Sequence, residues 1–114
     1  MKKVYLILFI STAFLLQLCS TKKKTQTVAT KKITYVADIQ PLVARHCSPC
    51  HIPPQGKKEP LNTFAAMTKE IDEVIESIKK NPGEHGFMPA RKAKLSDSTI
   101  NVFVDWKKGG MLEQ

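Results

Sequence analysis

Hydrophobic residues recur at helical spacing from Ile33 onward. The pattern predicts a short helix that runs into His46 and Cys47, in which Pro41 is tolerated because it lies in the first turn, with Asp38 before the helix proper. Its predicted apolar face consists of Val36, Ile39, Leu42 and Val43.

The middle of the chain predicts two further helices. Asn62 or Thr63 can cap a short helix that ends near Lys69, and the next helix begins near Glu70 and stops at residues 81–83, Asn-Pro-Gly. The apolar positions of this second helix, spaced i, i+3, i+4 and i+7, are Ile71, Val74, Ile75 and Ile78.

The last predicted helix begins after the capping residue Ser96 and ends at Gly109 and Gly110. One side carries Ile100, Phe103, Val104 and Lys107, with Trp106 beside them. Residues 52–60 and 84–95 contain prolines and glycines without periodicity and are predicted loops. No alternating strand pattern of useful length occurs, so we expect an all-α fold with about four short helices.

Residues 1–18 have the pattern of a signal peptide. Lys2 and Lys3 precede an apolar run that ends at Leu16, and this run is shorter than the roughly 20 apolar residues that a spanning helix needs. An uncleaved membrane anchor is the less favoured alternative. We therefore expect an exported protein.

Cys19 follows this apolar run directly. With Leu16 three positions earlier, it resembles the lipobox of bacterial lipoproteins, although Gln17 and Leu18 stand where that pattern has small residues. The resemblance implies acylation of Cys19 and attachment to the membrane. The alternative is an apolar cysteine inside an ordinary signal.

Residues 19–32 follow as a flexible, basic tether, because this Thr- and Lys-rich stretch lacks large apolar residues. Its lysines could lie against anionic lipid headgroups or be solvated as in any linker. Residues 33–114 then form a single domain.

The formal net charge of +8 raises the question of an acidic partner. Five of the lysines lie in the acid-free stretch before the domain, so the folded part is only mildly basic. The chain has no Arg-rich patch and no recognisable nucleic-acid-binding motif, which argues against a nucleic-acid partner.

The most informative stretch is Cys-Ser-Pro-Cys-His at residues 47–51. C-x-x-C-H is the attachment pattern of c-type haem: Cys47 and Cys50 can reach the two vinyl groups of one porphyrin, and His51 can then bind the iron. A covalent haem would also provide a core for a domain of about 80 residues, which is marginal on its own.

Two other chemistries compete for these residues. C-x-P-C is the spacing of thiol-disulfide exchange sites, but those sites are expected in a βαβ setting, which is absent here. A zinc site needs four ligands, and beyond the motif only the distant His85 could contribute.

From about residue 33 to its end, the chain resembles a class I cytochrome c domain. Three features carry the resemblance: the Cys-Ser-Pro-Cys-His motif, the sequence Gly-Phe-Met-Pro at residues 86–89, and a terminal helix bearing Trp106. The resemblance implies about four short helices around one covalent haem c and terminal helices that pack across each other. It also implies thioethers at Cys47 and Cys50, His51 as the proximal iron ligand and Met88 as the distal one. The carbonyl of Pro60 is the expected acceptor for the proximal imidazole.

The positions of the other methionines favour Met88 as the distal iron ligand. Met67 falls in a helical stretch and Met111 follows the final glycines, whereas Met88 lies in a loop beside Pro89, from which a thioether can reach the iron. The alternative distal ligand is His85, which would lower the reduction potential. His46 is expected to be a surface or packing histidine.

An iron with both axial positions filled has no vacant site for substrate, and the chain has one attachment motif. We therefore expect an electron carrier rather than an enzyme, on the periplasmic side of a bacterial envelope, serving redox protein partners alone or beside a larger oxidoreductase. The alternative is a haem sensor or gas-binding protein with a displaceable distal ligand. Charges that could steer docking to an acidic face, or simply be solvated, are Lys57, Lys58, Arg91, Lys92 and Lys94.

Overall fold

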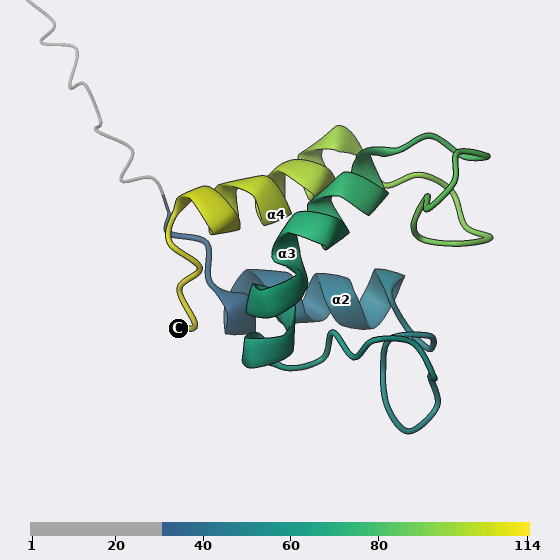
Figure 1. Ribbon diagram of the computed structural model, residues 1–114. Helices are drawn as coiled ribbons and strands as arrows, with labels where there is room; N and C mark the ends of the chain where they lie inside the picture. Colours follow the sequence, from purple (N-terminus) through teal and green to yellow (C-terminus); the bar gives the residue numbers. More distant parts are fainter. Residues whose placement is uncertain (1–30) are drawn as a thin grey trace, which may run out of the picture.

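The computed structural model describes residues 31–114 (Figure 1). The predicted signal peptide, Cys19 and the tether up to residue 30 lie outside the described residues. The described part consists of a π-helical turn, η1 (Tyr35–Ile39), and three α-helices, α2 (Gln40–His46), α3 (Phe64–Lys79) and α4 (Asp97–Lys108). It contains no strand beyond an isolated bridge between Thr34 and Leu112, which confirms the predicted all-α class. None of these helices is long and apolar enough to cross a membrane.

The first predicted helix is confirmed, with a change in its buried face. The Thr34 hydroxyl accepts a hydrogen bond from the Ala37 amide at 3.4 Å, and the Asp38 carboxylate accepts one from the Thr34 amide at 2.9 Å. This reciprocal pair satisfies amides that have no partner inside the helix. The wider π-helical turn brings Tyr35 into the core in place of Val36, whose exposed fraction is 47%.

The two helices predicted in the middle of the chain are one continuous helix, α3. Thr63 caps it by accepting a hydrogen bond from the Ala66 amide at 3.2 Å. The expected break near Lys69 was wrong because Met67 and Ile71 lie four positions apart on one buried stripe, and no helix-breaking residue separates them. The helix ends just before the Asn-Pro-Gly sequence, as predicted.

The last helix, α4, begins after Ser96, whose hydroxyl accepts a hydrogen bond from the Thr99 amide at 3.2 Å. Its buried residues are Ile100, Phe103 and Trp106. The predicted stripe placed Lys107 with the apolar positions, but Lys107 is exposed and forms an ion pair with Asp72 of α3. A long cationic side chain reaches solvent from the edge of a helix interface at little cost.

Aromatic side chains fix how these helices meet. α3 packs against α4, and α4 packs against η1. Tyr35, Phe64 and Trp106 come from η1, α3 and α4, and their ring centroids lie 5.7 to 6.3 Å apart in edge-on and tilted arrangements. Trp106 is fully buried, and its indole N–H donates to the carbonyl oxygen of Leu112 at 2.9 Å.

The two ends of the described chain lie side by side. The amide of Tyr35 donates to the Leu112 carbonyl at 2.8 Å, and the amide of Val36 donates to the Glu113 carbonyl at 3.1 Å. Two loops lie at the other end of the domain, as Figure 1 shows. The first loop comprises residues 47–63 and the second loop residues 80–96. The helices therefore form a frame, meaning η1, α2, α3 and α4 together, and the two loops lie at one end of it.

Candidate functional site

The Cys-Ser-Pro-Cys-His motif forms a tight turn directly after α2. The Cys47 amide still donates to the Val43 carbonyl at 2.9 Å, and the His51 amide donates to the Cys47 carbonyl at 3.1 Å. The rest of the first loop then folds back on the motif, because the Lys58 amide bonds to Cys50 and the Leu61 amide bonds to His51. Backbone bonds on both sides thus hold residues 47–51, which we call the attachment segment.

Gly56 makes this return of the first loop possible. A Cβ atom at this position would overlap the backbone oxygens of Cys50 and Pro49. Only glycine allows such a close approach of one backbone segment to another. The sequence marked Gly56 as part of a predicted loop and carried no signal for its contact with the attachment segment.

The His51 imidazole is oriented by the backbone of the same loop. Its Nδ1 atom lies 2.7 Å from the carbonyl oxygen of Glu59. The carbonyl of Pro60 was the predicted acceptor, and this prediction was wrong by one residue. The reason is the backbone register: the Leu61 amide pairs with the His51 carbonyl, which turns the Glu59 carbonyl toward the ring. With Nδ1 engaged, Nε2 is the nitrogen left for a metal.

One cavity of about 230 Å³ opens beside the attachment segment. Cys47, Cys50, His51 and Met88 all line it, so two distant parts of the sequence meet here. Its apolar walls come from both loops and α3 and include Leu61, Val74, Ile78, Pro89 and Leu95. The structure does not bring in His85, which is exposed and does not line the cavity.

The second loop carries Met88 to this cavity. The Met88 amide donates to the Ser77 carbonyl of α3 at 3.1 Å, and Pro89 beside it is buried. Met88 is half-buried and packs against the hydrophobic core. Met67, in contrast, is fully buried in α3, and Met111 is half-buried near the C-terminus. Met88 is therefore the methionine of the described chain that lines the cavity.

Both thiols of the attachment segment are free, with Cys50 exposed and Cys47 half-buried. Burial raises the pKa of the Cys47 thiol, and the nearby Lys92 ammonium offsets this only in part. Cys47 also follows the C-terminal end of α2, where the helix dipole disfavours a thiolate. Thiol-disulfide exchange needs a thiolate of lowered pKa, often at a helix N-terminus, so the environment of Cys47 is unfavourable for that chemistry.

His46 is a cavity residue that the sequence analysis assigned to the surface or to packing. Its side chain is half-buried and lines the cavity together with Cys47. Burial lowers the pKa of His46, and the positive charges of Arg45 and Lys92 lower it further. Its position next to Cys47 was the available signal, but the sequence could not show which way the ring turns at the end of α2.

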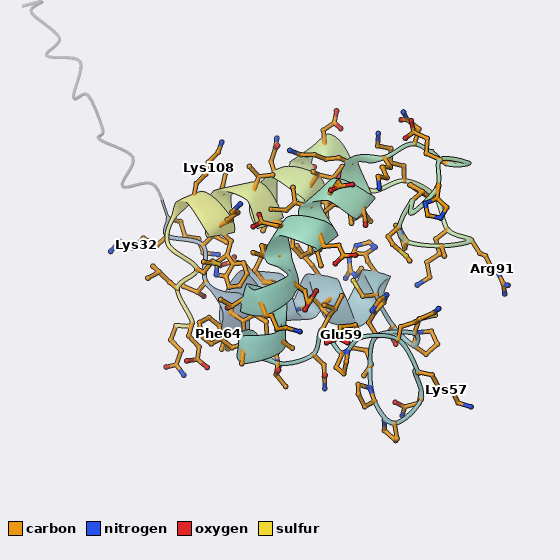
Figure 2. The ribbon with its side chains drawn as sticks, in the orientation of Figure 1. Lys32, Lys57, Glu59, Phe64, Arg91 and Lys108 are labelled. Carbon is orange, nitrogen blue, oxygen red and sulfur yellow. The ribbon has the colours of Figure 1, made fainter. Side chains whose placement is uncertain are left out.

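Charges of both signs surround the cavity. Lys58 and Lys92 line it from the two loops, while Glu70 and Glu73 line it from α3. Figure 2 shows Lys57 and Arg91 at the outer ends of the two loops, where both side chains reach solvent. The sequence pattern carried no signal that Glu70 and Glu73 would line the cavity. The cavity is thus bordered by basic loops and an acidic helix.

The donor set fits a c-type haem. Two free thiols can form thioethers, an imidazole with its Nδ1 hydrogen-bonded can bind iron, and a half-buried thioether can fill the second axial position. The apolar walls suit a porphyrin. Residues 31–114 contain no cluster of three or more His, Cys, Asp or Glu side chains that could hold a metal ion.

Comparisons with known proteins agree with this chemistry. The model of the family described as cytochrome c oxidase, cbb3-type, subunit III matches residues 35–106, well over half of the chain. Searches of curated proteins and of solved structures gave no match. Cytochrome c domains bind haem c covalently and serve in electron transfer, and domains of this family are usually exported to the periplasmic side. The chain belongs to this cbb3-type cytochrome c family and is a class I c-type cytochrome domain.

Proposed function

We propose that the chain carries single electrons between redox proteins of a bacterial cell envelope on one haem c. In this proposal Cys47 and Cys50 form the thioethers, His51 is the proximal iron ligand and Met88 is the distal ligand. The supporting observation is that these four side chains line one cavity although Met88 lies far from the others in the sequence.

The haem, when bound, supplies an iron that gains and loses one electron. The protein would contribute in two ways, by orienting the proximal ligand and by limiting the access of water to the iron. The Glu59 carbonyl holds the His51 ring in one orientation, and the apolar cavity walls limit access of water. Ligation of the iron by both His51 and Met88 would leave no position on it for a substrate.

A single haem is proposed because the sequence has one C-x-x-C-H motif. A haem held in the cavity would exchange its electron on the side of the domain where the two loops lie, because both loops line the cavity. Lys57, Lys58 and Arg91 are exposed there, and together with Lys92 and Lys94 they would favour a partner with an acidic face. If they steer docking, the rate of electron transfer to an acidic redox protein falls as ionic strength rises, and a rate independent of salt would exclude steering.

Attachment to the membrane through acylated Cys19 completes the proposal. The tether of residues 19–32 would then leave the domain close to the membrane surface but able to reach partners. Labelling cells with a clickable fatty acid tests this step. We expect label on the wild-type chain and none on Cys19→Ala, and the absence of label on both would exclude the lipid anchor.

The decisive experiment is to produce the full chain in cells that export proteins and attach haem c, and to record its spectrum. We expect one thioether-linked haem per chain, the ferric absorption band of methionine-bound iron, and poor binding of carbon monoxide to the reduced form. Rapid carbon monoxide binding would favour the gas-binding alternative. A colourless protein with two alkylatable thiols at Cys47 and Cys50 would refute the proposed function.

A further inference from the structure

Lys92 connects the second loop to the attachment segment. Its ammonium group donates to the carbonyl oxygen of Ser48 at 3.0 Å and to that of His46 at 3.4 Å. These partners are 44 and 46 positions away in the sequence. One side chain thus ties the loop that carries Met88 to the segment that carries both cysteines.

The two carbonyls are natural partners for a cation. His46 is the last residue of α2, and the final carbonyls of a helix have no partner inside it and carry partial negative charge. The Ser48 carbonyl belongs to the turn between the two cysteines. An ammonium group placed between them can satisfy acceptors on the helix end and on the turn at the same time.

The second loop has few other fixed points near Met88. The Met88 amide bonds to Ser77, and the Lys92 amide bonds to the Pro89 carbonyl at 3.2 Å within the loop itself. Lys94 pairs with Asn81 at the base of the loop. Arg91 has a φ of 61°, in the left-handed region, so the chain reverses just before Lys92. Among the side-chain hydrogen bonds of the described residues, the bond of Lys92 to the Ser48 carbonyl joins this loop to the attachment segment.

We infer that Lys92 is a positioning residue that holds the second loop against the attachment segment and so limits how often Met88 leaves the iron. This inference rests on the proposed function, in which Met88 is the distal ligand. The hydrogen bonds of the Lys92 ammonium group go to the carbonyls of Ser48 and His46 and not to either proposed ligand. Lys92 acts through the position of the second loop. Loss of its ammonium group would increase the population in which Met88 is away from the iron and an external ligand can bind there.

The test uses the haem-loaded full chain and small external ligands. The variants are Lys92→Gln, which loses the ammonium group, and Lys92→Arg, which keeps a cationic donor. The control is Lys57→Gln, which removes a loop charge that makes no side-chain hydrogen bond to the attachment segment among the described contacts. The readouts are the rate of imidazole binding to the ferric protein and of carbon monoxide binding to the reduced protein.

We expect Lys92→Gln to bind both ligands about fivefold faster, consistent with the loss of an exposed charge-assisted hydrogen bond, and Lys57→Gln to match the wild type. Lys92→Arg should stay close to the wild type. Equal rates in Lys92→Gln and the wild type would overturn the inference. An equal acceleration in Lys57→Gln would also overturn it, because the effect would then be one of charge alone.

Hydrogen exchange at the Met88 amide provides a second readout in the same proteins. Lys92→Gln should exchange faster at this position while exchange in α4 stays unchanged, since the frame is intact. The wild-type spectrum separates the two hypotheses. If the wild type lacks methionine-bound haem, the proposed function and this inference both fail. If it has such a haem and Lys92→Gln changes neither readout, only the role of Lys92 fails.

Discussion

The Nδ1 atom of His51 lies 2.7 Å from the carbonyl oxygen of Glu59, eight positions further along the chain. The acceptor is a backbone atom, so a substitution at Glu59 does not remove it. The Glu59 side chain pairs with Lys69 of α3 at 3.6 Å, with both groups largely exposed. The orientation of the ring therefore depends on the path of the first loop rather than on a side chain.

His51→Ala should abolish the normal spectrum of the haem protein. The variant loses the imidazole whose Nε2 is left for iron, so we expect poor haem incorporation or a spectrum without the methionine-bound ferric band. His46→Ala is the matched control, because His46 also lines the cavity but its Nδ1 has no such backbone partner among the described contacts. Absorption spectroscopy of both variants checks the prediction, and loss of the band in His46→Ala alone would contradict it.

Met88→Ala should open the distal position. We expect rapid carbon monoxide binding to the reduced protein, whereas Met88→His should keep both axial positions filled and lower the reduction potential. Met67→Leu is the control, since this fully buried residue of α3 tolerates a change of similar volume at a cost below about 1.5 kcal/mol. If His85→Ala rather than Met88→Ala opened the site, His85 would be the distal ligand.

Gly56→Ala should weaken the first loop strongly. The added Cβ meets backbone oxygens of the attachment segment, which cannot move aside as a flexible side chain can. We expect a loss of about 2 to 3 kcal/mol in the free energy of unfolding. At Gly83, which has a φ of 95° and no atom within 4 Å of an added Cβ, alanine should cost about 1 kcal/mol through backbone strain alone. Denaturant unfolding compares the two, and equal losses would contradict the steric argument.

Asp38→Asn should reduce the acid sensitivity of the fold. Hydrogen bonds from Lys31 and from the Thr34 amide lower the pKa of Asp38 below its ordinary value of 3.8. A lowered pKa means that the ionised carboxylate stabilises the folded state. This contribution is complete above the ordinary pKa and is lost as pH falls through the lowered one.

The difference in unfolding free energy between wild type and Asp38→Asn should therefore shrink as pH falls from about 5 to about 2. Urea unfolding at several pH values measures it. A difference that stays constant across this range would show that Asp38 contributes by packing and not by charge.

Local chemistry made much of the structure predictable. Thr63 and Ser96 cap α3 and α4 because a hydroxyl just before a helix accepts a hydrogen bond from an otherwise unpaired amide of its first turn. This signal involves only a few neighbouring residues, so it can be recognised in a single sequence. The family and the all-α class followed from the C-x-x-C-H motif and helical periodicity. Both were confirmed by the match to the family and by the helices of the structure.

The features that were missed depend on contacts between distant segments or on backbone register. The π-helical turn exchanged Val36 for Tyr35 in the core, since Tyr35 packs against Phe64 and Trp106. The Glu59 carbonyl replaced that of Pro60 because of a backbone pairing between Leu61 and His51. The bonds of Lys92 join positions more than 40 residues apart, for which a single sequence carries no signal.

The ends of the described chain meet on one side of the domain, and the outer parts of the two loops lie on the other. Figure 2 shows Lys32 on the first side and Lys57 and Arg91 on the second. An electrode coupled through the C-terminus would therefore face the side of the domain away from the two loops, whereas coupling through Lys57 would turn the cavity toward the electrode surface. The same protein immobilised in these two ways should give slow and fast interfacial currents, and orientation on a biosensor surface becomes a matter of choosing the coupling residue.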